Sequence, residues 1–310
     1  MNKFYVKVPA TTANLGPGFD CMGMALGLHN EFWFTEIPTG LEVIVSGEGH
    51  EGIPADERNL VVRGVRYVCQ HLGRDLTGLR LEQTNHVPAA SGMGSSSTAI
   101  VAGLLGGNAL LGSPLNREEI LQLATNIEGH PDNVAPAIFG GLVLVPLGED
   151  GACEHIEHIP MPTLNAVLVL PDFTLFTADA RAALPTEVSR DDAIFNMSHV
   201  ALLVRALETG DYQKLAIAMQ DKIHQPYRMA LIPGMAEAMS AAKEAGAAAV
   251  VISGAGPSLI AFAPSGLSEI GDAMMAVYQA HGLTSRKWLF ATDDIGSVVQ
   301  PASAPKTTSV

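Results

Sequence analysis

The sequence has little positive charge. Its 310 residues include 18 Lys and Arg against 32 Asp and Glu, which gives a formal net charge of −14. A strongly acidic chain is repelled by phosphate backbones and by anionic lipid, so this balance argues against non-specific binding to nucleic acid or to anionic membranes. If the protein binds a polyphosphate, the local positive potential has to come from something other than a basic surface.

Cysteine is also scarce, and apolar runs are short. Cys21, Cys69 and Cys153 lie far apart and are odd in number, so we expect free thiols and neither a disulfide framework nor a paired-cysteine metal site. No apolar stretch is long enough for a transmembrane helix. The first residues alternate like a strand and lack the apolar region of a signal peptide, so we expect a cytoplasmic protein.

Hydrophobic residues make up 47% of the chain and charged residues 16%, which is enough to build two compact cores over this length. Strand-like and helix-like segments follow one another in mixed order, and this favours an α+β fold over a doubly wound sheet. We place a domain boundary near residue 158, between a domain of residues 1–158 and one of residues 159–310. Only the tail 300–310, rich in Pro, Ser and Thr, is expected to be frayed.

Hydrophobic periodicity and turn residues predict the individual elements. The expected strands span residues 3–8, 29–36, 41–46, 78–83, 140–146, 166–170, 247–253, 258–263 and 286–290. The expected helices span residues 58–72, 95–111, 117–127, 191–208, 212–224, 235–245 and 267–281. Asn116 and Glu119 form a capping-box pattern at the start of one helix, and Gly129 suits the left-handed position that ends it.

The segment 88–97 reads Pro-Ala-Ala-Ser-Gly-Met-Gly-Ser-Ser-Ser and precedes a strongly apolar helix. Gly92 and Gly94 permit backbone angles closed to other residues and let a ligand approach the main chain. The first helical turn, at Ser95–Ser97, has unpaired N–H groups and the positive end of the helix dipole, which favour an anion. The loop can therefore hold phosphate without a lysine, although a glycine-rich start of a core helix fits the same pattern.

Two other phosphate motifs are missing or misplaced. A Walker A motif requires a Gly-Lys pair, and the sequence has none. The glycine spacing of a dinucleotide-binding fingerprint occurs at residues 47–52, but Glu48 and Glu51 would repel phosphate, and Pro54 follows where a helix should begin. We interpret residues 47–52 as an exposed turn.

Pro88–Ser97 resembles the phosphate loop of the GHMP kinases, a family of small-molecule kinases that use ATP. Two further family motifs stand in the right order, Pro9–Asp20 before the loop and Ser253–Ser258 after it. Three ordered motifs across nearly the whole chain are far more specific than any one of them. The departures are mild, because Met93 replaces a leucine and Ser97-Thr98 replaces a common Ala-Ala.

The resemblance implies an N-terminal domain like ribosomal protein S5 domain 2 and a C-terminal ferredoxin-like domain, with ATP between them. The loop residues that would bind ATP are Pro88, Ala89, Ala90, Ser91, Gly92, Met93, Gly94, Ser95, Ser96 and Ser97. The resemblance also implies that Glu128 and Ser96 hold Mg²⁺. This ion prefers a few carboxylate or hydroxyl oxygens together with phosphate and water.

Within the family, the segments Ala13–Asp20, Glu128–Ala137 and His224–Arg228 resemble the branch that phosphorylates homoserine. L-Homoserine carries a carboxylate, an ammonium group and a primary hydroxyl. A fork-shaped guanidinium suits the carboxylate, and the resemblance assigns Arg181 and Arg228 to it.

The same resemblance assigns the remaining contacts with the substrate. Asn14 and Asp20 would accept the ammonium group, and His130, Asn133 and Thr177 would lie near the reacting hydroxyl. His130 is thus expected both to bind the substrate and to take part in catalysis.

Asn133 stands where other GHMP kinases carry an aspartate that can act as a base. An amide cannot take the proton, and we expect the neighbouring Asp132 side chain to point elsewhere. The branch that phosphorylates homoserine shares this asparagine and is thought to rely on positioning and charge stabilisation. Phosphoryl transfer with a loose transition state needs little help from a base, so this is physically acceptable.

Taken singly, these residues have plainer explanations. A glutamate at a helix end is usually solvated, a helical arginine usually forms a surface ion pair, and His130 before a proline can be a turn residue. His155 and His158, with Glu154 and Glu157, have a spacing that suggests metal, but a solvated face is more typical of such a segment.

We therefore predict an enzyme that phosphorylates L-homoserine to O-phospho-L-homoserine with ATP, on the route to threonine. A homodimer is expected because many relatives are dimers. One alternative is another GHMP kinase, of the shikimate or mevalonate-pathway type. A second is a catalytically silent nucleotide-binding sensor module, against which the retention of Glu128, Ser96 and Asn133 argues.

Overall fold

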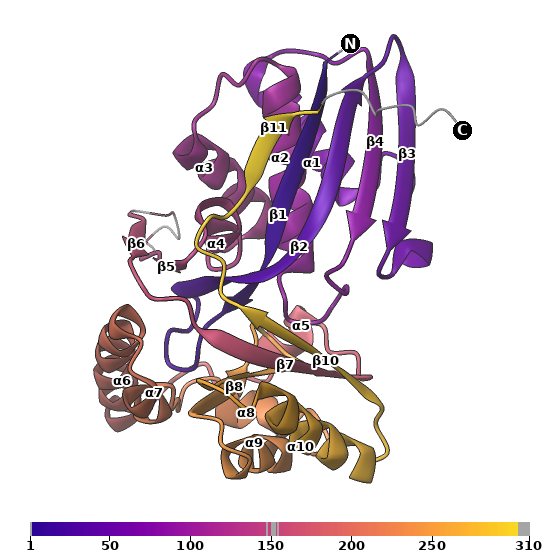
Figure 1. Ribbon diagram of the computed structural model, residues 1–310. Coiled ribbons are helices and arrows are strands. Elements are labelled where there is room, and N and C mark those ends of the chain that lie inside the picture. The colour runs from indigo at the N-terminus through magenta and orange to yellow at the C-terminus, as the bar shows by residue number, and fades with distance from the viewer. Residues whose placement is uncertain (1, 147, 150–152, 154, 303–310) are drawn as a thin grey trace.

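The computed structural model describes residues 2–146, 148, 149, 153 and 155–302. Figure 1 shows two halves stacked one above the other, each built on its own sheet. The strands of the first half are β1 (Lys3–Ala13), β2 (Met22–Glu36), β3 (Gly40–Gly47), β4 (Gly78–Asn85), β5 (Leu142–Leu144), β6 (Glu157–Ile159) and β11 (Val298–Pro301).

The sheet of the first half has the strand order β11-β1-β2-β4-β3, and β5 joins it by pairing with β2 and with β6. β3 and β4 run parallel, so the chain between them has to cross over, and it does so through α1 (Leu60–Leu72). The other pairs are antiparallel. The register of β1 on β2 shifts between Pro9 and Ala10, and past this bulge β1 continues to Ala13, where the first family-like motif lies.

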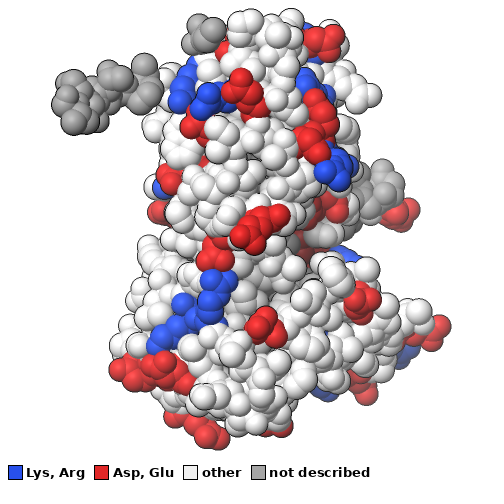
Figure 2. All heavy atoms as spheres, turned by 90° about the vertical axis from the view of Figure 1, so that its right-hand side faces the viewer, with Lys and Arg blue, Asp and Glu red and all other residues white. Residues whose placement is uncertain are grey.

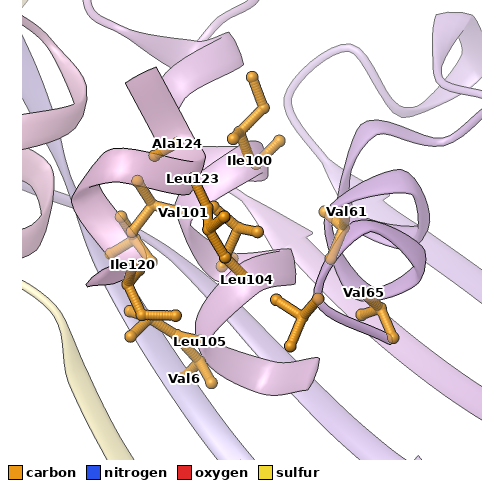
Figure 3. Close-up of a cluster of buried hydrophobic side chains, with 14 of the residues drawn as sticks. Val6, Val61, Val65, Ile100, Val101, Leu104, Leu105, Ile120, Leu123 and Ala124 are labelled. Atoms are coloured by element: carbon orange, nitrogen blue, oxygen red, sulfur yellow. The ribbon is translucent and has the colours of Figure 1, made fainter. Parts of the chain in front are cut away.

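Four helices pack against the first sheet: α1, α2 (Ser95–Leu110), α3 (Arg117–Glu128) and α4 (Val134–Phe139). Nearly every residue of α2 is buried, because α2 lies between the sheet and the neighbouring helices. Figure 3 shows Leu104 and Leu105 of α2 among valines of β1 and α1 and apolar residues of α3. At Gly103 a Cβ atom would lie 2.2 Å from the Val61 carbonyl oxygen, so the close contact between α1 and α2 requires glycine there.

The second half has the strands β7 (Asn165–Pro171), β8 (Ala249–Ile252), β9 (Leu259–Phe262) and β10 (Ser285–Ala291), in the sheet order β10-β7-β9-β8 with antiparallel pairs. Its helices are α5 (Thr177–Ala182), α6 (Arg190–Thr209), α7 (Tyr212–Ala218), α8 (Gln225–Met229), α9 (Met235–Glu244) and α10 (Leu267–Ala280). Helices follow β7 and β9, so the element order matches the β-α-β-β-α-β pattern of a ferredoxin-like domain. The predicted α+β fold with this second domain is confirmed.

A shared apolar core joins the two halves. Met24 and Met93 from the first half pack in the same buried cluster as Leu168 of β7, Ile260 of β9 and Leu203 of α6. Burying apolar area at this interface favours a fixed arrangement of the two sheets. The predicted boundary near residue 158 falls within β6, and the exact division at that residue stays a prediction.

Most of the predicted elements are present, and the local signals at their ends are confirmed. The capping box of Asn116 and Glu119 forms at α3, and Gly129 ends that helix with φ 89°. Residues 47–52 form an exposed turn that includes a short 3₁₀ helix (His50–Gly52) with no buried residue. Cys21, Cys69 and Cys153 are free thiols, as expected.

Some predictions of elements are wrong in part, and some elements were not expected. The expected helix 212–224 ends at Ala218, because the Asp221 carboxylate accepts the backbone N–H groups of Ile223, His224 and Gln225 and redirects the chain into α8. The short helices α4, α5 and α8 and the short strands β6 and β11 were not expected. The tail was expected to be frayed from residue 300, but residues 300 and 301 belong to β11, which pairs with β1. Residues 303–310 lie outside the described part of the chain.

Acidic and basic side chains are scattered over the face of the molecule shown in Figure 2. An ion pair connects the two halves on the surface, where Arg286 of β10 donates to both carboxylate oxygens of Glu48 at 2.9 and 3.1 Å. Among the helices in the described part of the chain, none has the length and apolarity needed to cross a membrane.

Candidate active site

A cavity of about 200 Å³ lies where the two halves meet. The segment 88–97 lines one part of it, and the polar residues expected to bind an amino acid line the rest. The predicted site residues in its lining are Asn14, Asp20, Ala90, Ser91, Gly92, Gly94, Ser95, Ser96, Ser97, Glu128, His130, Asn133, Thr177, Arg181 and Arg228. The structure therefore collects in one place residues that are far apart in the sequence.

Three loop residues expected at the ATP site are not in this lining. Met93 is fully buried and forms part of the apolar core between the halves, and its backbone carbonyl accepts the N–H of Thr11 at 3.1 Å. Ala89 lines a separate hollow near Arg286, and Pro88 lines neither. The contacts expected between these three residues and ATP stay predictions.

The three family-like motifs meet at the two glycines of the loop. At Gly92, with φ 75°, a Cβ atom would lie 2.3 Å from the Ser253 carbonyl oxygen, and the Ser253 hydroxyl donates to the Gly92 carbonyl at 2.7 Å. At Gly94, with φ 66°, a Cβ atom would lie 2.0 Å from the Thr11 hydroxyl oxygen. A side chain at either position would force these segments apart.

Gly94 is the N-cap residue of α2, and glycine has no side chain that could accept the first N–H groups of the helix. Ser95, Ser96 and Ser97 of the first turn line the cavity. The unpaired N–H groups and the helix dipole make this end of the cavity suitable for an anion. The charge needed to hold phosphate can therefore come from backbone dipoles in a protein with a net charge of −14.

Glu128, the last residue of α3, faces the serines at the start of α2. Its two carboxylate oxygens accept hydrogen bonds from the hydroxyls of Ser96 at 3.1 Å and of Ser97 at 3.2 Å. Neighbouring ligands of an octahedral Mg²⁺ ion lie about 3.0 Å apart when the bonds are about 2.1 Å long. The separation of the Ser96 and Glu128 oxygens therefore fits two adjacent ligands of this ion.

No group of three or more His, Cys, Asp or Glu residues that could hold a metal occurs in the described part of the chain. A Mg²⁺ ion here would take its remaining ligands from phosphate and water, which suits its chemistry. His155 pairs with Glu157 at 3.0 Å on the exposed surface, and His158 bonds the carbonyl of the buried Gly140 at 3.0 Å. Glu154 lies outside the described residues.

After Gly129 turns the chain, His130, Asp132 and Asn133 form a small hydrogen-bonded group. The Asp132 carboxylate lies 2.8 Å from His130 Nδ1 and accepts from the Asn133 amide at 3.2 Å. This hydrogen bond raises the pKa of His130 against the opposing effect of burial. Asn133 Oδ1 accepts the hydroxyl of Thr11 at 2.8 Å, which ties the group to the end of β1.

The expectation that Asp132 points elsewhere is wrong. Its carboxylate is almost completely buried and belongs to the lining of the cavity. The turn at residues 129–133 brings it there, with the carboxylate held between His130 and Asn133. The adjacent Asp-Asn pair in the sequence was the only signal, and it does not say which side chain faces inward.

Asp20 and Arg181 form a bidentate salt bridge in the lining of the cavity. The two Arg181 Nη atoms donate to the two Asp20 carboxylate oxygens, each at 2.8 Å. The pairing raises the pKa of Arg181, with the hydrogen bonds to Asp20 as the largest cause. The residues expected to bind the ammonium and carboxylate groups of a substrate therefore bind each other in this structure.

Arg228, in α8, is 2% exposed. Its Nη1 donates to the Gly254 carbonyl and to His224 Nδ1, both at 3.2 Å, and its Nε donates to the Ala180 carbonyl at 3.4 Å. Its Nη2 has no hydrogen-bond partner among the described residues. Burial, and then the nearby Arg181, lower the pKa of Arg228, but a guanidinium stays charged at physiological pH.

Asn14 and Asp20 have positive φ angles, 72° and 57°, which are unusual for residues with side chains. Asn14 holds the loop in this shape, because its Oδ1 accepts the Asp20 N–H at 3.0 Å and its Nδ2 donates to the Gly254 carbonyl at 2.8 Å. Phe19, which sequence analysis missed, lies under both arginines, 5.1 Å from Arg228 and 5.7 Å from Arg181. Residues with strained backbone angles, such as Asn14 and Asp20, are typical of functional sites.

Comparison with known proteins gives two family matches. The family models described as "GHMP kinases N terminal domain" and "GHMP kinases C terminal" match residues 59–141 and 203–280. The homoserine kinase of Moorella thermoacetica is 48% identical over 295 residues, which are 95% of this chain and 99% of that protein. The homoserine kinase of Gloeobacter violaceus is 52% identical over 260 residues, 83% of this chain and 86% of that protein.

Two solved structures show the same arrangement of elements. The crystal structure of homoserine kinase from Cytophaga hutchinsonii has a TM-score of 0.87 and 32% identity, covering 97% of this chain and 98% of that chain. The structure of L. major mevalonate kinase in complex with R-mevalonate has a TM-score of 0.69 and 21% identity, covering 98% of this chain and 96% of that chain. At that identity, the second likeness shows the fold alone.

Proposed function

The chain belongs to the homoserine kinases of the GHMP kinase family, and we propose that it transfers the γ-phosphoryl group of ATP to the hydroxyl of L-homoserine in the cavity described above. The product is O-phospho-L-homoserine, an intermediate of threonine biosynthesis. One observation carries the assignment to this cavity. A single cavity has an uncapped helix start at one part and the groups Asp20, Arg181 and Arg228 at another, so it can take a polyphosphate and an amino acid together.

ATP would place its phosphates on the first turn of α2. The N–H groups of Ser95–Ser97 and the close approach permitted by Gly92 and Gly94 would replace water around the phosphate oxygens. Mg²⁺, held by Glu128 and Ser96, would neutralise charge that develops on the phosphate oxygens. The Ser96–Glu128 oxygen separation of 3.1 Å supports this pair of ligands.

The amino acid would occupy the part of the cavity lined by the two arginines. Arg228 would bind the carboxylate, because its Nη2 lacks a partner among the described residues and a buried guanidinium gains most from an anion. Arg181 would join it after exchanging Asp20 for the substrate carboxylate. Asp20, so released, would accept the ammonium group as expected, together with the neighbouring Asp132. Asn14 was also expected to accept it, but its Oδ1 already accepts the Asp20 N–H, so we propose that Asn14 instead holds the loop in place.

The reacting hydroxyl would lie near His130, Asn133 and Thr177. Asn133 cannot accept a proton, and its Oδ1 already accepts from Thr11. The side chains would therefore act by orienting the hydroxyl toward the phosphate, and the proton would leave to solvent or phosphate. A loose transition state makes this sufficient, because little charge builds up on the attacking oxygen.

An assay of substrate selectivity tests this function. Purified protein with Mg-ATP should release ADP rapidly with L-homoserine and far more slowly with mevalonate, shikimate or galactose, and ³¹P NMR should identify O-phospho-L-homoserine. Turnover of another alcohol without turnover of homoserine would contradict the proposal. ATP binding without turnover of any of these alcohols would favour a silent nucleotide-binding module.

The cellular location, the oligomeric state and the division into domains are also proposals. A biosynthetic kinase that uses ATP is expected in the cytoplasm. The homodimer expected from the family resemblance can be tested by analytical ultracentrifugation. The division into domains of residues 1–158 and 159–310 can be tested by limited proteolysis, which should cut first near the proposed boundary.

A further inference from the structure

His224 lies beside the cavity without lining it, and the function proposed above gives it no role. It is the residue before α8, and its side chain is completely buried. Its Nε2 lies 2.7 Å from the Gly16 carbonyl oxygen and its Nδ1 lies 3.2 Å from Arg228 Nη1. One imidazole ring thus contacts the loop that carries Asn14 and Asp20 and the arginine that faces the substrate carboxylate.

The two contacts fix which ring nitrogen carries the proton. Arginine only donates hydrogen bonds, so Nδ1 has to accept, and a carbonyl only accepts, so Nε2 has to donate. Both requirements are met by one neutral tautomer, protonated at Nε2. Burial lowers the pKa of His224, which agrees with a neutral ring, although Asp221 Oδ2 lies 3.6 Å from Nε2 and favours the charged form.

The surroundings of His224 leave the ring little freedom to move. It stacks on Phe19 with the ring centres 5.1 Å apart and an angle of 23° between the planes. Phe19 in turn lies under the guanidinium of Arg228 at 5.1 Å. The Gly16 backbone is also tightly packed, because a Cβ atom there would lie 2.3 Å from the Met219 carbonyl oxygen. His224 therefore rests on rigid structure from both halves.

Arg228 depends on this support for the direction of its guanidinium. Its Nη1 has two acceptors, His224 Nδ1 and the Gly254 carbonyl, and its Nε has a long contact of 3.4 Å. Without His224 the guanidinium can rotate about the end of the Arg228 side chain. Nη2 would then no longer point toward the position proposed for the substrate carboxylate. A bidentate contact with a carboxylate is sensitive to such a rotation.

We propose that His224 is a positioning residue for the amino-acid substrate, which holds the Arg228 guanidinium in register with the Asn14–Asp20 loop through one hydrogen bond to each. The carboxylate and the ammonium group of an α-amino acid sit on the same carbon, so their binding groups have to keep a fixed separation. His224 sets that separation across the interface of the two halves. This inference rests on the proposed homoserine kinase function.

A pair of variants tests the proposal. His224→Gln can still donate toward the Gly16 carbonyl but places no acceptor at the position of Nδ1, whereas His224→Asn keeps an oxygen there. We expect His224→Gln to raise the KM for homoserine roughly ten- to hundredfold, the size expected for losing a hydrogen bond to a charged group, with the KM for ATP within about twofold of the original. His224→Asn should show a smaller rise.

A substrate without the carboxylate separates this role from a general structural one. The compound 3-aminopropan-1-ol is homoserine with the carboxylate replaced by hydrogen, and it should be phosphorylated with the same low efficiency by the original protein and by His224→Gln. An equal loss with both substrates, or equal KM values for Gln and Asn variants, would overturn the proposal. If the original protein does not phosphorylate homoserine at all, the proposed function is wrong. This inference, which rests on that function, is then wrong as well.

The tautomer can be measured on the unaltered protein, whether or not the variants fold. Long-range ¹H–¹⁵N NMR spectra should show the His224 ring protonated at Nε2 and unprotonated at Nδ1, and homoserine should shift the Nδ1 signal because Arg228 gains a carboxylate. A ring protonated at Nδ1 cannot accept from Arg228. That result would overturn the proposal directly.

Discussion

Arg228 is a buried cation with no carboxylate in contact among the described residues. Its hydrogen-bond acceptors are two backbone carbonyls and a neutral imidazole nitrogen. A buried charge is costly unless an opposite charge or hydrogen bonds compensate for it, so a site of this kind gains stability when it binds an anion. Arg181 differs, because Asp20 already neutralises it.

Replacing Arg228 tests its role in binding. Arg228→Ala should raise the KM for homoserine by about a hundredfold or more, the loss of a charge-assisted contact in a buried site, and leave the KM for ATP nearly unchanged. Arg117→Ala is the matched control, because Arg117 donates to two backbone carbonyls away from the cavity. The control should lower the melting temperature without affecting either KM. Equal rises in both KM values for Arg228→Ala would contradict the carboxylate role.

Glu128 can be tested by removing its charge. Glu128→Gln keeps the size of the side chain but weakens an oxygen ligand for Mg²⁺, so kcat should fall at least about tenfold and the Mg²⁺ concentration at half-maximal rate should rise. Glu118→Gln, at the exposed start of the same helix α3, should change neither value. Steady-state rates over a Mg²⁺ titration measure both quantities. An unchanged Mg²⁺ dependence would remove Glu128 from the metal site.

His130 should titrate above its ordinary pKa of 6.5, because the Asp132 carboxylate favours the charged ring. A pKa that folding raises stabilises the protein fully below the unfolded pKa, and this contribution is lost as the pH rises through the folded pKa. Asp132→Asn should bring the pKa of His130 back down and remove this pH dependence. An NMR titration of the ring protons, assigned with His130→Gln, measures the shift, and an unchanged pKa would contradict the role of Asp132.

At the scale of elements, the start of α2 matters most. The α2 helix is held between the sheet, α1 and α3, so its first turn is fixed in direction by the core and not by the loop that precedes it. Gly92 and Gly94 then let Ser253 and Thr11 come into contact with the loop. Packing thus holds the start of α2 in place, which would reduce the entropy lost if an anion binds there.

Gly94→Ala should impair the use of ATP at the start of α2. Both Gly94 and Gly266 are N-cap glycines with positive φ angles, 66° and 73°, but a Cβ atom would strike Thr11 at Gly94 and meets no atom within 4 Å at Gly266. Each substitution should cost about 1–2 kcal/mol of stability for the left-handed backbone. Only Gly94→Ala should also lower kcat/KM for ATP by about tenfold or more, because Thr11 and its partner Asn133 are displaced. Similar kinetic losses in both variants would contradict this explanation.

At the scale of the whole molecule, the end of the described chain returns to its beginning. After β10 the chain crosses back to the first half, where β11 pairs with β1 from Phe4↔Pro301 to Lys7↔Val298. On the way, Arg117 donates to the Ser297 carbonyl at 2.8 Å. β1 contains Thr11 and leads into the loop of Asn14 and Asp20, so the second half of the sequence helps to hold the strand that precedes this loop.

Removing β11 tests this connection. A chain that ends after Ser297 should unfold at a lower temperature, because each lost ladder hydrogen bond contributes about 1 kcal/mol and the edge of β1 becomes exposed. A chain that ends after residue 302 keeps all the described pairs with β1 and should unfold at a higher temperature than the shorter chain. Calorimetry measures both. Equal melting temperatures for the two truncations would show that β11 contributes nothing to the fold.

The sequence by itself determined whatever depends on neighbours a few residues away. The capping box of Asn116 and Glu119, the stop at Gly129 and the helix start after Gly94 are all local, because they involve backbone groups within one turn. The order of three motifs was enough for the family, and periodicity was enough for most strands and helices. The proposed binding of phosphate at the loop rests on the same local groups.

Only the tertiary structure decided which side chains meet. Asp132 lines the cavity, Asp20 pairs with Arg181, and His224 lies between Gly16 and Arg228. Each of these depends on the direction of a side chain or on segments up to 208 residues apart in the chain. Local propensity carries no information about such contacts, because they form only when the shared core fixes the two sheets relative to each other.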